Sequence, residues 1–217
     1  MSSSLSMGGL ASTRLVLVRH GQTDFNRDGR LQGQVDIPLN AAGAKQAALL
    51  AAAVAENPPD LIVSSPLQRA HETARAIGQA CGLEVSTDEA FLERGFGQWE
   101  GLTGDEIRRR WPTEHAAWRD HREVTGLDVE DRPAVGSRVA AACRQLVADN
   151  RGGTVMVVTH GAAITLAITA LLGLDANEFR GLAGLENCHR SVLEPLRSDP
   201  DGRLMRLLSH NVGPDFI

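Results

Sequence analysis

The chain has few cysteines, and their number and spacing argue against both a disulfide framework and a metal site. Only Cys81, Cys143 and Cys188 occur among the 217 residues. Three is an odd number, and their spacing is not that of metal ligands. Proteins of the cytoplasm keep their cysteines reduced, whereas small secreted domains depend on paired ones. We therefore expect a cytoplasmic protein.

Long apolar runs and a strong excess of one charge are also absent. No segment approaches the roughly 20 apolar residues that a membrane-spanning helix needs. The formal net charge of −5 is too small to indicate nucleic acid or a membrane surface as a partner. The first residues, MSSSLSMGGLAS, lack the basic start and apolar stretch of a secretory signal. We expect residues 1–13 to form a flexible leader and residues 14–217 to form a single domain.

Several common catalytic patterns are missing as well. The sequence contains no G-x-S-x-G elbow, no glycine-rich nucleotide fingerprint and no Walker pattern. His115 and His121 have no acidic or cysteine partners at the spacing of zinc ligands. No other catalytic scheme is therefore well supported. Lysine is almost absent too, since Lys45 is the only one. Arginine suits phosphate binding, but a GC-rich genome produces the same bias without any functional cause.

The most informative feature that is present is the run LVLVRHGQTD, from Leu15 to Asp24. A short apolar run that ends in Arg19-His20-Gly21 is typical of a buried strand in a parallel sheet. Such sheets carry their chemistry just past the carboxyl ends of the strands. A second apolar run, 154–158, leads into Thr159-His160-Gly161 in the same way. The two junctions predict an active site with two histidines at one edge of the sheet.

Strand and helix patterns alternate along the chain. Apolar runs predict further strands at 60–63, 83–85, 191–196 and 204–208, and helical patterns cover about 41–56, 66–80, 135–150 and 162–172. Asn40 and Ser65 are the expected N-caps of the first two helices, and Asp201-Gly202 is the expected turn between the last two strands. The range 93–131 contains all three tryptophans and departs from this pattern. The alternation predicts an α/β sandwich with a mainly parallel sheet, with 93–131 as a small, mostly helical insertion over the active site.

Four residue positions suggest phosphoryl transfer. A neutral imidazole such as that of His20 can attack phosphorus through one nitrogen while the other donates to a carbonyl. Arg19 stands beside it, and Arg69 is expected in the first turn of a helix, where it either points to the same sheet edge or is a solvated surface arginine. Glu93 precedes a glycine-rich stretch and is the best candidate general acid, with Glu100 and Glu106 as rivals.

These segments together resemble the histidine phosphatase superfamily, the phosphoglycerate mutase-like proteins. The resemblance rests on LVRHGQTDFN, LQG at 31–33, DIPLN at 36–40, SSPLQRAHETA at 64–74, LERGFGQWEGLT at 92–103 and VTHG at 158–161, in that order. It implies a three-layer α/β/α sandwich and a reaction without a metal or an organic cofactor, because the arginines and histidines carry the positive charge. It further implies that His20 becomes phosphohistidine, that Arg19, Arg69 and His160 complete the phosphoryl pocket, and that Glu93 donates the proton. The substrate-binding candidates are Gln22, Thr23, Asn26, Gln32, Gly33, Arg94 and Gly161.

Departures from the family pattern bear on the reaction. The mutases have an Asn-Ser-x-x-Arg run after the second His-Gly, whereas this chain has 162–165 as Ala-Ala-Ile-Thr. It also lacks their longer insertion, so hydrolysis is favoured over transfer. Glu93-Arg94, in contrast, resembles the Glu-Arg pair of the mutases. Arg94 either contacts a second anionic group of the substrate or is an exposed arginine. His189 and Arg190 are unusual for the family, and we expect one of them to help select the substrate.

The leading hypothesis is a phosphatase for a small phosphomonoester, such as a phosphorylated sugar or phosphoglycerate derivative. A cofactor-dependent phosphoglycerate mutase is the alternative, and a non-catalytic binding scaffold is a third hypothesis. Within the superfamily, the stretches RHGQTDFN and LQGQ-D look similar to the glucosyl-3-phosphoglycerate phosphatases; an alpha-ribazole phosphatase or a broad sugar-phosphate phosphatase fits nearly as well. The expected partner is a small phosphate ester, without nucleic acid or membrane. Whether the chain forms a homodimer is left open.

Overall fold

A computed structural model describes residues 12–199 and 202–214, and a six-stranded sheet forms its centre. The strand order is β3-β2-β4-β1-β5-β6. The strands are β1 (Arg14–Arg19), β2 (Leu61–Ser64), β3 (Val85–Thr87), β4 (Thr154–Thr159), β5 (Arg190–Pro195) and β6 (Met205–Val212). The first four are mutually parallel, while β5 and β6 are antiparallel to their neighbours. The predicted mainly parallel sheet is confirmed.

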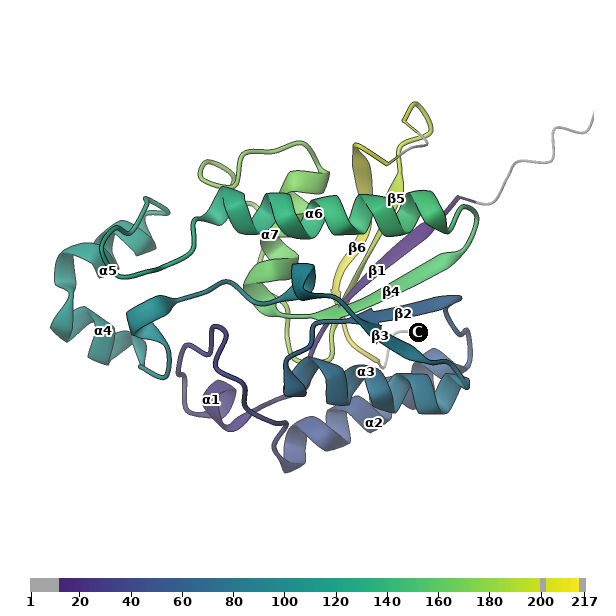
Figure 1. Cartoon of the computed structure of the whole chain (residues 1–217), viewed down its shortest axis with the longest axis horizontal. Coiled ribbons are helices and arrows are strands. Elements are labelled where there is room, and N and C mark those ends of the chain that lie inside the picture. The colour runs from purple at the N-terminus through teal and green to yellow at the C-terminus, as the bar shows by residue number, and fades with distance from the viewer. Residues whose placement is uncertain (1–11, 200–201, 215–217) are drawn as a thin grey trace, which may run out of the picture.

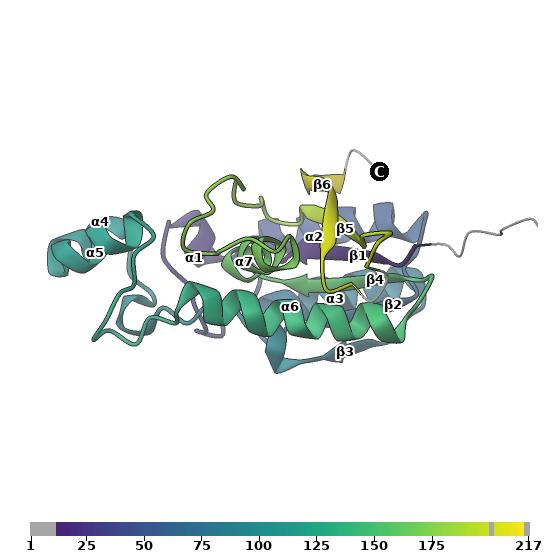
Figure 2. The same ribbon diagram turned by 90° about the horizontal axis from the view of Figure 1, so that it is seen from above.

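Helices cover both faces of the sheet, as Figures 1 and 2 show. Alternate residues of β1 point to opposite faces: Leu15 and Leu17 belong to one core cluster, and Val16 and Val18 belong to another. The first cluster is completed by α6 (Arg132–Asp149) and α7 (Gly161–Leu171), and the second by α2 (Ala41–Ala55) and α3 (Gln68–Cys81). The three-layer α/β/α sandwich is therefore confirmed.

The insertion packs around a small core of its own. It contains the short helices α4 (Gly104–Arg110) and α5 (Pro112–Arg119) and the 3₁₀ turn η2 (Gly97–Trp99), and a second 3₁₀ turn, η1 (Glu89–Phe91), leads into it. Trp99 and Ile107 are fully buried in this core. Figure 2 shows α4 and α5 standing beyond one end of the sheet. Because α4 and α5 have only 7 and 8 residues, irregular backbone makes up most of 93–131, contrary to the mostly helical expectation.

Several element boundaries also differ from the predicted ones. Helix α3 begins at Gln68 and not at Pro66, because Leu67 is extended. Strand β3 begins two residues late, because the amide of Leu83 still bonds to the end of α3. Helix α6 begins at Arg132, with a proline in its first turn. The short α1 (Asp24–Arg27) follows β1 directly.

Two predicted features, the leader and the last turn, lie partly outside the described residues. The leader expected at 1–13 falls mostly outside the described residues, but Thr13 is buried and its hydroxyl accepts a hydrogen bond from the Gly152 amide. Of the expected turn, Asp201 lies outside the described residues and Gly202 has a positive φ of 73°. No helix in the described ranges is long and apolar enough to cross a membrane.

Candidate active site

A pocket of about 360 Å³ opens at the carboxyl ends of β1 and β4. Both predicted strand-to-histidine junctions meet there, since β1 and β4 are parallel neighbours with Arg19 opposite Thr159. The pocket is lined by Arg19, His20, Phe25, Asn26, Gly29, Arg30, Leu31, Gln32, Gly33, Arg69, Glu93, Phe96, Gly161, Ala162, Gly184 and Leu185. The lining combines three arginines with apolar and aromatic side chains.

His20 stands at the end of β1 with its imidazole held in one orientation. Its Nδ1 lies 2.7 Å from the carbonyl oxygen of Gly21, so Nδ1 donates the hydrogen bond and Nε2 is left with its lone pair. Burial, together with the charges of Arg69 and Arg19, holds the pKa of His20 well below its usual value of 6.5. The imidazole is therefore neutral, as a nucleophile must be.

The backbone after His20 is fixed by an unusually close approach. A Cβ atom on Gly43 would lie 2.0 Å from the carbonyl oxygen of Gln22, so only glycine permits this contact between the first turn of α2 and the loop. Asn40 caps α2 by accepting from the Gly43 amide, as predicted. The start of α2 thus positions the loop that directly follows His20.

His160 follows β4 and is fully buried beside His20. The two ring centroids are 5.2 Å apart in an edge-to-face arrangement. His160 Nε2 lies 2.8 Å from Ser65 Oγ, whereas its Nδ1 is buried without a hydrogen-bond partner. Burial and the nearby Arg69 hold the pKa of His160 well below 6.5, so this imidazole is also neutral.

Arg69 and Arg19 are each anchored by main-chain carbonyls. Arg69 is fully buried, and its two Nη atoms donate to the oxygens of Gly33 and Val35, both at 2.8 Å. Arg19 donates from Nη1 to the oxygen of Leu185. Burial lowers the pKa of Arg69 to about 10, which still leaves it charged at neutral pH. The expectation that Arg69 points to the sheet edge fits this geometry, and a solvated arginine does not.

Three buried nitrogens around His20 have no protein partner: Arg19 Nε, Arg69 Nε and His160 Nδ1. A buried polar group without a partner is costly, so such atoms are rare unless a ligand satisfies them. Two of the three belong to cations. The group that fits them is a small anion with several acceptor oxygens, placed next to His20 Nε2.

Glu93 approaches this cluster from the segment before the insertion. Its Oε1 accepts hydrogen bonds from the amides of Arg94, at 2.8 Å, and Ala163, at 2.9 Å. Its Oε2 accepts a longer bond of 3.2 Å from the amide of Ala162. The side chain is nearly buried and lines the pocket. The amides at the start of α7 therefore hold the carboxyl group beside the reacting position.

The remaining predicted binding residues mostly lie in or directly behind the pocket wall. Asn26, Gln32, Gly33 and Gly161 line it. Thr23 is fully buried behind them and donates to the Gln32 side chain at 2.8 Å. Their roles in substrate binding remain predictions.

Two predicted binding residues lie elsewhere. Gln22 does not line the pocket. Its side-chain oxygen accepts a hydrogen bond from Asn40, and its main-chain amide donates to the side chain of Gln46. Arg94 is buried and not exposed; its Nε donates to the carbonyl of Glu130, and its guanidinium lies over the Phe96 ring, 5.4 Å from the centroid.

The rival acids and the proposed selectors are also placed outside the pocket. Glu100 accepts from the amides of Gln34 and Phe96, while Glu106 forms the capping box of α4. His189 bonds to Asn211, and neither His189 nor Arg190 lines the pocket, so neither is placed to select the substrate.

Sequence reasoning missed Arg30, which lines the pocket and bonds to Glu106, and two anchoring residues, Ser65 and Arg138. Ser65 was predicted only as a helix cap, and the contact of its hydroxyl with His160 joins residues far apart in sequence. Arg138, on α6, donates to the main-chain oxygen of Glu93 at 3.1 Å. No local pattern marks either anchor, although two serines before a helix that carries Arg69 form a weak signal.

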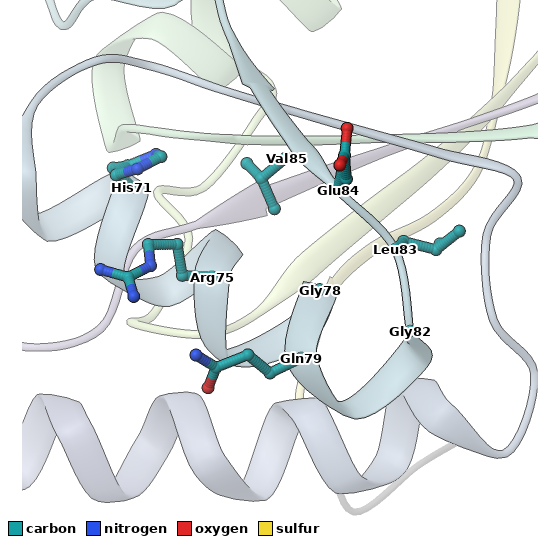
Figure 3. Close-up of a pocket in the computed structure, with 8 residues that line it drawn as sticks. All are labelled: His71, Arg75, Gly78, Gln79, Gly82, Leu83, Glu84 and Val85. Atoms are coloured by element: carbon teal, nitrogen blue, oxygen red, sulfur yellow. The ribbon is translucent and has the colours of Figure 1, made fainter.

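A larger hollow of about 520 Å³ lies between α3 and β3 and shares no residue with the pocket around His20. Figure 3 shows His71, Arg75 and Gln79 along α3, with Glu84 and Val85 on the neighbouring segment at the edge of the sheet. It contains one histidine and one acid and no paired catalytic groups. Within the described residues, no cluster of His, Cys, Asp or Glu side chains could hold a metal ion.

Comparison with known proteins agrees with this geometry. A glucosyl-3-phosphoglycerate phosphatase of Mycobacterium tuberculosis is 37% identical over 186 residues, which cover 82% of this chain and 83% of that protein. Phosphoserine phosphatase 1 of Hydrogenobacter thermophilus is 33% identical over 181 residues, covering 83% and 85%. A solved mycobacterial glucosyl-3-phosphoglycerate phosphatase with VO3 has a TM-score of 0.84 and 35% identity, covering 92% of this chain and 99% of that one.

These relatives are phosphatases, so phosphomonoester hydrolysis is favoured over mutase chemistry. The family model of the histidine phosphatase superfamily (branch 1) matches residues 15–207, which span both histidine junctions and the residues between them. The chain belongs to the histidine phosphatase superfamily, in its phosphatase branch.

Proposed function

We propose that this phosphatase works without a metal, through a phosphohistidine on Nε2 of His20. The observation that carries the proposal is the set of three buried nitrogens without a hydrogen-bond partner, on Arg19, Arg69 and His160, around a neutral imidazole. Phosphoryl transfer requires mainly positioning and neutralisation of charge on the phosphoryl oxygens. Two guanidinium groups supply that charge, in the role that a metal ion has in other phosphatases.

The proposed reaction proceeds in two steps. In the first, the Nε2 lone pair of His20 forms a bond to phosphorus while the ester P–O bond breaks, and Glu93 gives its proton to the leaving oxygen. In the second, Glu93 takes a proton from water while the water oxygen forms a bond to phosphorus. The P–N bond to His20 breaks, and inorganic phosphate is released. Oε2 of Glu93 accepts only one long hydrogen bond, so it is the oxygen best placed to carry this proton.

The substrate that we propose is a small phosphorylated hydroxy acid or its sugar derivative. The relatives named for glucosyl-3-phosphoglycerate and phosphoserine support this class. A pocket of about 360 Å³ accommodates a metabolite of this size. Its outer wall offers Phe25, Leu31 and Phe96 for packing, and Arg30 for a polar group. The alternative of a phosphoglycerate mutase was supported by Arg94 as a possible contact for a second anionic group of the substrate. The Arg94 side chain instead donates to the carbonyl of Glu130 and does not line the pocket.

We also propose a cytoplasmic location, in agreement with the three free cysteines. A small phosphate ester remains the proposed partner, with no nucleic acid or membrane. Homodimer formation remains untested, and light scattering of the purified protein would measure it.

The decisive experiment measures phosphate release by the purified protein in the presence of a chelator, across a set of phosphorylated metabolites. His20→Ala should lower kcat/KM by more than about 10³-fold, whereas the control His71→Ala, on the other hollow, should have little effect. Undiminished activity of His20→Ala would refute the phosphohistidine mechanism. Incubation with 3-phosphoglycerate and a trace of bisphosphoglycerate distinguishes the reactions, because a phosphatase releases phosphate and a mutase forms 2-phosphoglycerate.

A further inference from the structure

The hydrogen bonds of Ser65 determine which nitrogen of His160 carries the proton. Ser65 is fully buried between β2 and α3. Its Oγ accepts from the amide of Leu67 at 3.4 Å and lies 2.8 Å from Nε2 of His160. A hydroxyl group has one proton to donate and two lone pairs. Since Leu67 already uses a lone pair, the hydroxyl proton needs an acceptor, and among the described residues Nε2 of His160 is the acceptor that lies at hydrogen-bond distance.

The alternative tautomer fits the surroundings poorly. If Nε2 of His160 carried the proton, the hydroxyl proton of Ser65 would lack an acceptor, and both groups are buried. Nδ1 would then be a buried acceptor in the ring next to His20, and it could not donate to the phosphoryl oxygens that the proposed function places there. With the proton on Nδ1, all of these atoms are satisfied except the Nδ1–H group. That group then becomes a donor for the phosphoryl oxygens, alongside the free Nε atoms of Arg19 and Arg69.

We propose that Ser65 is a positioning residue of the phosphatase: its hydroxyl donates to Nε2 of His160 and thereby holds Nδ1 in the protonated form that binds the phosphoryl group. This inference rests on the proposed function. It also explains why Ser65 does not act as the N-cap of a helix beginning at Pro66. Leu67 is extended, and its amide donates to the Ser65 hydroxyl.

The first test measures the tautomer in the unchanged protein, by ¹⁵N NMR of histidine-labelled enzyme at neutral pH. His160→Gln assigns the resonances by their disappearance. We expect Nδ1 of His160 to show the shift of a protonated nitrogen and Nε2 that of an unprotonated one. The opposite pattern would overturn the proposal, and this measurement does not depend on catalysis. The proposed function fails separately, if His20→Ala retains activity.

The second test compares Ser65→Ala with Ser64→Ala. Ser64 is equally buried, but its hydroxyl donates to the main-chain oxygen of Ser65 and does not contact His160. The probe is inorganic phosphate, measured as a competitive inhibitor together with kcat. We expect Ser65→Ala to weaken phosphate binding and lower kcat by about 10- to 100-fold, the range seen when the outer partner of a metal-bound histidine is removed.

The tautomer and the kinetics must change together. Ser65→Ala should redistribute the proton of His160 between the two nitrogens in the NMR spectrum, and Ser65→Thr, which keeps a hydroxyl group, should restore the wild-type pattern. Ser64→Ala should leave the tautomer unchanged. If Ser65→Ala binds phosphate as well as Ser64→Ala does, the hydroxyl of Ser65 has no positioning role and the proposal is wrong.

Discussion

Replacing Arg138 by methionine should slow catalysis without weakening phosphate binding. The guanidinium of Arg138 donates to the main-chain oxygens of Ala90, Leu92 and Glu93 at 2.8–3.1 Å, and it forms a two-pronged ion pair with Glu130. This one side chain therefore holds the segment that delivers the proposed acid. The groups that we propose bind phosphate lie, in contrast, on α3 and at the carboxyl ends of β1 and β4.

The size of the effect follows from these contacts. Removing one partner of a buried ion pair costs about 3–5 kcal/mol, and both side chains here are about one-quarter exposed, so we expect a loss of about 2–4 kcal/mol in the free energy of unfolding. Three carbonyls also lose their donors. A displacement of about 1 Å in a catalytic group can cost 10²-fold in rate, so kcat should fall by about that factor.

The assay measures kcat, the inhibition constant of inorganic phosphate and the urea denaturation midpoint. Arg144→Met is the matched control, because Arg144 lies on the same helix and also donates to two carbonyls, those of Ala170 and Arg203. We expect kcat to fall only in Arg138→Met, with little change in the phosphate constant. Equal loss of kcat in both variants would refute the positioning role of Arg138.

Three further predictions concern pH, packing and metals. Burial and nearby arginines hold the pKa values of His20 and His160 well below 6.5. Below pH 6.5 the unfolded chain therefore binds protons that the folded protein does not bind. The free energy of unfolding is highest above pH 6.5 and decreases below it, by up to about 1.4 kcal/mol per pH unit for each group. Urea denaturation should show a shallower pH dependence when both are glutamine. Gly43→Ala places a Cβ 2.0 Å from the Gln22 oxygen and should cost about 1–3 kcal/mol in urea denaturation, unlike Gly104→Ala, where nothing lies within 4 Å. Exhaustive chelation should leave phosphate release unchanged, and activity restored only by added metal would contradict the mechanism.

The parts of the site that could be predicted from the sequence are those set by local pattern. An apolar run ended by glycine is a local signal, so β1 and β4 and the histidines at their ends were predicted within about one residue. Parallel pairing then brought His20 and His160 together. Their neighbours in sequence were less predictable. Gln22 looked equivalent to Thr23, but its side chain bonds to the cap of α2 and lies outside the pocket.

Long-range contacts set the rest, and no periodicity reveals them. Ser65 reaches His160 across 95 positions, and Arg138 reaches Glu93 across 45. Arg94 could have faced the substrate or solvent, and the choice depends on Glu130, which lies at the far end of the insertion. The insertion itself was misjudged: glycines with positive φ, such as Gly101 and Gly126, lie before α4 and after α5, in backbone that is not helical.

The four groups of the phosphoryl pocket share one design. Each uses part of its hydrogen-bonding capacity on the protein: His20, Arg19 and Arg69 bond to main-chain carbonyls, and His160 bonds to a serine. Each then keeps at least one nitrogen for the proposed ligand. Because the protein bonds already fix the side chains, little conformational freedom is lost when phosphate binds, and the donors need no reorganisation as charge develops on the phosphoryl oxygens. The carbonyl and serine partners therefore contribute to the reaction by holding these groups in place.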